Sequence, residues 1–181
     1  MRYTDPDGRE LSVETGDKNF IKKVENDLKQ ICPSATVDSE TGKVAIDDSV
    51  KIDGHEKGTE LIVGLVNSNN MHIIRKTTEG NSAEPNSDSF SEGTPCGSYV
   101  NFNPKKLTGG KDSSGSKERP TYVGLSHELG HSESFDNGTQ VFDKGTGKDG
   151  TTPPAESNSL KRENDVRKEN GLYIRPYYYN Y

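Results

Sequence analysis

Apolar residues fall on one face of a helix near the start of the chain. Between residues 17 and 31 their spacing is that of an amphipathic helix, which Pro33 closes: Phe20, Ile21, Val24, Leu28 and Ile31. Two later stretches, 120–135 and 153–170, are also predicted to be helical. Each begins with proline, which the first turn of a helix tolerates, and Gly171 is a typical terminator after the second.

Shorter β-rich runs lie between the first and second helices. Isolated apolar residues predict short strands separated by turns: Val37, Val44, Ile46, Val50 and Ile52. Residues 61–66 and 71–76 are richer in β-formers, and the polar segment 67–70 between them predicts a hairpin. Residues 98–102 alternate as a strand does. We therefore expect an α+β fold with a small, mostly antiparallel sheet.

Polar residues fill the remaining segments. Residues 77–97, 108–118 and 136–152 are rich in Ser, Asn, Gly, Glu and Asp, and we expect loops there. The first sixteen residues have the composition of turns. The expected organisation is an N-terminal arm over residues 1–16 and one domain over residues 17–181.

Composition excludes several classes of protein. The chain has 181 residues, of which 27% are hydrophobic, and its formal net charge is −6. No apolar run is long enough to span a bilayer, and we find no signal peptide at the N-terminus. An acidic balance without a long basic run argues against nucleic-acid binding. The two cysteines, Cys32 and Cys96, either form one disulfide or remain separate thiols. We expect a monomer that inserts into no membrane.

The strongest chemical signal is the pentapeptide His127-Glu128-Leu129-Gly130-His131 in the second predicted helix. Two histidines four residues apart share one helix face, so both imidazoles reach one ion at about 2.0–2.1 Å, the Zn–N distance. Glu128 stands beside that face, where it can remove a proton from a zinc-activated water and deliver it to the leaving amine. This pattern predicts a hydrolytic zinc site.

Such a site needs a third protein ligand and one open position. No histidine follows His131, so we expect a downstream carboxylate. Glu156 is our preferred ligand because it stands in the first turns of the last predicted helix, as the ligand glutamate of gluzincins does. Two alternatives remain. Asp149 ends a Gly-Thr-x-x-Asp sequence that resembles the ligand motif of aspzincins, and Glu163 lies further along the same helix.

The closing stretch resembles a known family. Residues 161–172, followed by Arg175-Pro176-Tyr177, are similar to the Glu-Asn-x-x-Arg-x-Glu-x-Gly-Leu-Pro-x-Arg-x-x-Tyr pattern of the NleD-like metallopeptidases, effectors injected into host cells by type III secretion. The strand that ends at Asn103-Pro104 is also similar, and the resemblance covers roughly residues 58–177. It implies a small zincin-like domain, zinc as cofactor and a protein substrate in a target cell.

The N-terminal segment carries a second, shorter resemblance. Residues 2–9, with the sequence Arg-Tyr-Thr-Asp-Pro-Asp-Gly-Arg, resemble the junction at which Rhs/YD-repeat proteins pass into their variable toxin domains. This implies that the chain is the C-terminal toxin domain of a larger secreted carrier, with a cognate immunity protein as a possible partner.

These observations predict a zinc-dependent endopeptidase. His127, His131 and Glu156 hold zinc, Glu128 is the general base and acid, and Arg175 or a tail tyrosine such as Tyr177 stabilises the oxyanion. Two alternatives remain: a zinc hydrolase of a non-protein amide such as a peptidoglycan cross-link, and a non-catalytic module that zinc stabilises. Structural zinc sites are usually closed by four ligands and rich in cysteine, which speaks against the second alternative.

Overall fold

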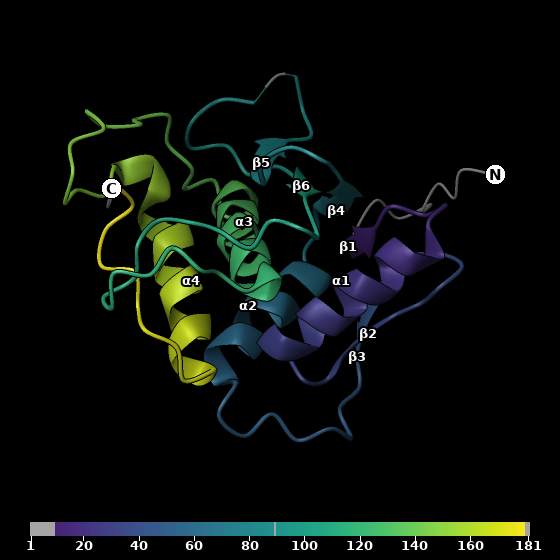
Figure 1. Cartoon of the computed structure of the whole chain (residues 1–181). Helices are drawn as coiled ribbons and strands as arrows, with labels where there is room; N and C mark the ends of the chain where they lie inside the picture. Colours follow the sequence, from purple (N-terminus) through teal and green to yellow (C-terminus); the bar gives the residue numbers. More distant parts are fainter. Residues whose placement is uncertain (1–9, 89, 180–181) are drawn as a thin grey trace.

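The computed structural model describes residues 10–88 and 90–179 of the chain. The predicted α+β class is confirmed, with a small sheet and four α-helices in the described part (Figure 1). The elements in chain order are β1 (Glu10–Val13), α1 (Lys18–Ile31), β2 (Ala35–Val37), β3 (Val44–Ile46), α2 (Glu56–Val66), β4 (Met71–Lys76), β5 (Ser82–Pro85), β6 (Ser98–Phe102), α3 (Thr121–Asp136), the 3₁₀ turn η1 (Pro154–Glu156) and α4 (Ser157–Glu169).

The main sheet has the strand order β1-β4-β6-β5. β4 runs parallel to both β1 and β6, and only β5 pairs antiparallel, with β6. The expectation of a mostly antiparallel main sheet is therefore wrong. Antiparallel pairing does hold for β2 and β3, which form a separate two-stranded sheet.

β4 does not run in the direction that the predicted hairpin requires, because residues 61–66 are not a strand. They are the second half of α2, in which Leu61, Ile62 and Leu65 are buried at helical spacing. A short apolar run of this kind fits a buried strand and a buried helix equally well. As a helix it carries the chain back across the sheet, so β4 enters parallel to β1 and no hairpin forms.

The structure differs from three further expectations about where strands lie. The predicted arm over residues 1–16 includes β1, whose Leu11 and Val13 are buried in the core. The junction motif at residues 2–9 lies outside the described residues. The predicted loop over residues 77–97 contains β5, a polar segment that becomes a strand by pairing with β6. Val50 and Ile52, expected in a strand, lie in the turn region before α2.

The core lies between the main sheet and the helices, which occupy one side of it (Figure 1). Alternate strand residues face the helices: Leu11, Val13, Ile74, Val100 and Phe102. α1 contributes the predicted apolar face and begins at Asp17, whose carboxylate accepts hydrogen bonds from the amides of Asn19 and Phe20. α3 is buried on nearly every side, because α1, α2, α4 and the sheet all pack against it.

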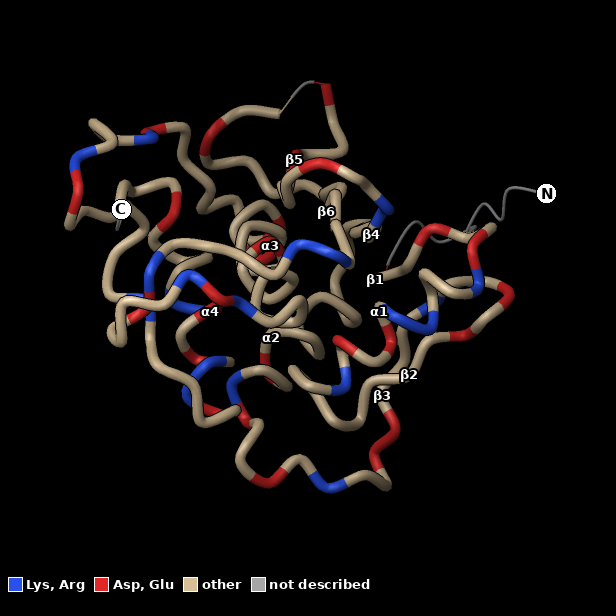
Figure 2. The backbone as a smooth tube through the Cα atoms, in the orientation of Figure 1, with Lys and Arg blue, Asp and Glu red and all other residues tan. Residues whose placement is uncertain are grey.

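Charged residues lie around this core and are not gathered on one face of the molecule. Basic and acidic positions are interspersed along the described chain (Figure 2). No helix among the described residues is long and apolar enough to cross a membrane. Cys32 and Cys96 are buried free thiols, which settles the alternative left open by the sequence.

Helix α4 lies beside α3 (Figure 1). The two helices approach closely at Gly130. A Cβ at Gly130 would stand 2.7 Å from Cα of Ser159 on α4, whereas a Cβ at Gly64 in α2 would meet no atom within 4 Å. Both glycines are inside helices, so alanine gains similar helix propensity at each, and the difference between them isolates the packing.

We expect Gly130→Ala to lower the free energy of unfolding by about 1–3 kcal/mol, because α4 must move away from α3. Gly64→Ala should raise it by up to about 1 kcal/mol. Urea denaturation of both variants tests this. Equal stability of the two would contradict a tight α3–α4 contact.

Candidate metal centre

Helix α3 presents the two histidines of the pentapeptide on one face, as predicted. Its rings at His127 and His131 are 5.2 Å apart between centroids. The imidazole of His127 is almost fully buried, and that of His131 is slightly more exposed. The rigid one-turn spacing of the helix fixes this pair before any other element contributes.

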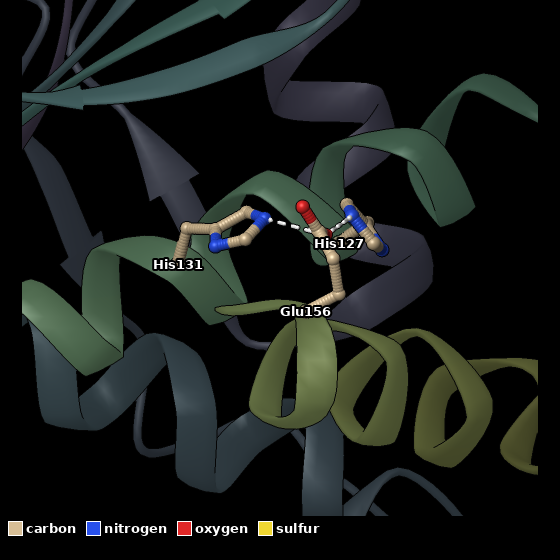
Figure 3. Close-up of side chains that lie close together, drawn as sticks. All are labelled: His127, His131 and Glu156. Atoms are coloured by element: carbon tan, nitrogen blue, oxygen red, sulfur yellow. Dashed lines mark hydrogen bonds and ion pairs between the residues drawn. The ribbon is translucent and has the colours of Figure 1, made fainter. Parts of the chain in front are cut away.

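Glu156 approaches the same point from η1, just before α4 (Figure 3). Its Oε2 lies 3.2 Å from Nε2 of His127 and 3.1 Å from Nε2 of His131. One ligand atom from each of the three residues lies within 4.8 Å of the other two. The structure thus brings together the three residues that the sequence nominated as metal ligands.

These distances allow a test of whether a zinc ion fits. Four ligand atoms at about 2.0–2.1 Å from a tetrahedral centre are about 3.3–3.4 Å from each other. The two measured contacts to Glu156 are within a few tenths of an ångström of that edge length. The donor set of two imidazole nitrogens and one carboxylate oxygen suits zinc, and it leaves a fourth position open.

The two alternative ligands lie elsewhere. Asp149 is exposed in the loop between α3 and η1 and is not part of the group. Glu163, on α4, is fully buried, and its Oε2 lies 3.0 Å from Nδ1 of His127. Glu156 contacts the other ring nitrogen, Nε2. Glu163 therefore contacts the imidazole on the side away from the candidate ligand, where it can orient the ring. Arg167 and Arg175 lie 2.9 and 3.4 Å from the Glu163 carboxylate.

The electrostatics of the cluster favour a cation between the carboxylates. Burial lowers the pKa of His127, but contacts with Glu156 and Glu163 and the charge of Glu128 outweigh it and raise the pKa to about 9. For Glu156, burial raises the pKa, but its contacts with both histidines outweigh this and hold the pKa far below its usual range. A proton on His127 balances these negative charges, and a divalent cation can take over that balance by displacing it.

The cluster opens into a cleft of about 330 Å³. The cleft is lined by His127, Glu128, His131, Glu156, Tyr178 and the residues of β5, among others. Glu128 is only 6% exposed, and it lies one residue from His127 on the same wall. The proposed base and the candidate ligands therefore face one space.

Two residues of the site, Tyr178 and Gln140, could not be singled out from the sequence, although a tail tyrosine was expected there. Tyr178 lines the cleft and stacks on His127, with 5.8 Å between ring centroids and 24° between ring planes. Burial, together with the charges of Glu156 and Glu128, raises the pKa of its phenol to about 12. Gln140, in the loop after α3, has its Oε1 3.2 Å from Nδ1 of His131. A polar loop residue and one of several tail tyrosines carry no local signal of such a role.

Arg175 and Tyr177, the two residues expected to stabilise the oxyanion, do not occupy the positions that this role requires. Arg175 is engaged by Glu163, and its guanidinium lies over the ring of Tyr178, 4.7 Å from the centroid. Tyr177 is 46% exposed and is not among the residues that line the cleft. Tyr178 is the tail tyrosine that reaches the site.

We expect purified protein to bind about one Zn²⁺ per chain, and Glu156→Ala to weaken that binding at least about tenfold, because an oxygen ligand is lost. Asp149→Ala is the matched control and should leave affinity nearly unchanged. Isothermal titration of metal-free protein measures both. If Asp149→Ala weakens binding as much as Glu156→Ala does, the assignment of Glu156 is wrong.

Comparison with known proteins gives a match to a family model. A model of peptidase family M91, described as effector protein, matches residues 7–163, which include the pentapeptide, Glu156 and Glu163. The rest of the tail, with Arg175 and Tyr178, lies beyond the match, although the tail resemblance noted above extends to residue 177. No curated protein and no solved structure matches the chain. Because the match covers most of its length, the chain belongs to peptidase family M91, a family of effector proteins.

Proposed function

We propose that this domain is a zinc-dependent endopeptidase that cleaves a protein substrate inside a target cell. The observation that carries the proposal is the convergence of His127, His131 and Glu156 in the cleft that Glu128 also lines. Membership of a peptidase effector family agrees with it. A zinc ion bound there would act as a Lewis acid and lower the pKa of a water molecule toward about 7.

Glu128 serves in this mechanism as the group that moves the proton. Its carboxylate takes a proton from the attacking water and returns it to the leaving amine nitrogen, which cannot depart as an anion. The side chain follows His127 directly on a rigid helix, so its position relative to the histidines is fixed by the backbone. Burial keeps competing solvent away from the transferred proton.

Tyr178 is the residue that we assign to the developing oxyanion. Its phenol is protonated at neutral pH, as that of an ordinary tyrosine is, and its pKa is raised further, to about 12. A neutral O–H in a partly buried cleft is a suitable donor to the oxygen on which negative charge accumulates. Stacking on His127 holds the ring at the metal centre.

The edge strand β5 indicates how a peptide could bind. β5 is the last strand of the main sheet, and within the described part of the chain it pairs on one side only, with β6. Residues 82–85 line the cleft beside His127 and Glu128. An extended peptide that adds to this edge as a further strand would present its backbone to the metal centre, and this favours a polypeptide over a small amide as substrate.

Delivery into a target cell is part of the same proposal. The effector family supports it, and the residue 2–9 resemblance to an Rhs junction supports a larger carrier. Such a toxin domain would require an immunity protein in the producing cell, and we expect that partner to cover the cleft.

Glu128→Gln tests the chemistry. We expect it to reduce peptide hydrolysis by about 10²–10⁴-fold, because glutamine keeps the shape of the side chain but moves no proton. Cleavage is measured with a proteome-derived peptide library and the zinc content of the same preparation by elemental analysis. A variant that cleaves as fast as wild type, or that loses its zinc, would contradict the role of Glu128.

Expression in the cytosol tests the biological setting. The domain should arrest growth of a susceptible cell, and Glu128→Gln should relieve the arrest at equal protein level because hydrolysis is the cause. Asp149→Ala, a matched surface substitution, should remain toxic. Equal toxicity of wild type and Glu128→Gln would point to another activity.

A further inference from the structure

The amide of Gln140 has all of its hydrogen-bonding groups engaged at the metal centre. Its Nε2 donates one hydrogen bond to the carbonyl of Val141 at 2.9 Å and one to the carbonyl of Ala155 at 3.2 Å. Its Oε1 faces Nδ1 of His131. Gln140 is only 7% exposed, so water offers its amide few alternative partners.

This arrangement fixes which way the amide points. Two backbone carbonyls can only accept, so the NH₂ group must face them, and the oxygen must face His131. An amide oxygen can only accept, so Nδ1 of His131 must carry a proton. The unshared electron pair of a neutral imidazole is then on Nε2, the nitrogen that faces Glu156 and His127.

Gln140 also connects two ligands that come from different elements. Ala155 immediately precedes Glu156, so the hydrogen bond to its carbonyl holds η1 against the end of α3. The backbone of Gln140 is itself tied to α3, because the amides of Thr139 and Gln140 donate to the carbonyl of Ser134. A single side chain therefore links the orientation of His131 to the position of Glu156.

We propose that Gln140 is a positioning residue of the metal centre, which sets the tautomer of His131 and the register of Glu156 against it. The proposal rests on the proposed function, because it concerns the same site. Side chains that support a ligating histidine in this way typically contribute about 10–100-fold in metal affinity.

Three variants test the proposal by metal binding rather than by activity. Gln140→Met has nearly the same size but lacks the amide. Gln140→Glu keeps an acceptor for Nδ1 of His131 but loses both donors. Gln30→Met is the matched control, since Gln30 is an exposed residue on α1. The probes are Zn²⁺ affinity of metal-free protein by competition with a chelator, and the visible absorption of Co²⁺ bound in its place, which depends on ligand geometry.

We expect Gln140→Met to weaken Zn²⁺ binding about 10–100-fold and to alter the Co²⁺ spectrum. Gln140→Glu should show a smaller but measurable loss, because the contact to His131 remains while the hydrogen bonds to the carbonyls of Val141 and Ala155 are gone. Gln30→Met should match wild type. The melting temperature of the metal-free proteins separates this effect from a general loss of stability, which would lower that temperature and leave the Co²⁺ spectrum unchanged.

Wild-type affinity in either Gln140→Met or Gln140→Glu would overturn the proposal, and so would equal losses in the two variants. Should Gln140→Met not fold, Gln140→Glu against wild type still decides, because wild-type affinity there would contradict the positioning of Glu156 through the hydrogen bond to Ala155. Failure of the proposed function is distinguished by the wild-type protein, which would then bind no metal or would bind metal without hydrolysing peptides. In the second case the affinities of the variants still decide the role of Gln140.

Discussion

Burial of carboxylates on both sides of one imidazole is the constraint on which the rest of this structure depends. Glu156 and Glu163 approach opposite ring nitrogens of His127, where water is largely excluded. An isolated charge in such a place costs several kcal/mol, so each carboxylate needs a hydrogen bond or a cation. Arg167 and Arg175 supply that for Glu163, and the histidines supply it for Glu156. A divalent cation held by His127, His131 and Glu156 would complete the balance.

The close contact between α3 and α4 makes this arrangement possible. Gly130 stands between the two histidines in sequence, and its missing side chain allows the backbone of α4 to approach at Ser159. The same approach brings Glu163 behind His127 and η1 in front of it. The glycine inside the pentapeptide thus acts in packing, while its neighbours are the residues to which we assign the chemistry.

The C-terminal tail is held by the same helix. Asn164 on α4 exchanges two hydrogen bonds with the backbone of Arg175, one as donor at 2.8 Å and one as acceptor at 2.7 Å. The guanidinium of Arg175 then joins Glu163 to the ring of Tyr178. The Glu-Asn pair at positions 163 and 164 therefore serves two purposes: the glutamate supports a histidine, and the asparagine secures the tail that brings Tyr178 to the cleft.

The sequence by itself determined the features that arise from local geometry. Helix α1 follows from apolar spacing and a capping aspartate, and the pairing of His127 with His131 follows from one turn of α3, because neighbouring turns fix side-chain positions without help from distant residues. The sequence narrowed the third ligand to three carboxylates. The tertiary structure brought only Glu156 to the Nε2 side of the histidines and set Glu163 behind the ring. It also decided the helical state of residues 61–66, the strand at residues 82–85 and the positions of Gln140 and Tyr178 beside the two histidines. Each of these features depends on contacts with residues far along the chain. A local sequence pattern gives no information about such contacts.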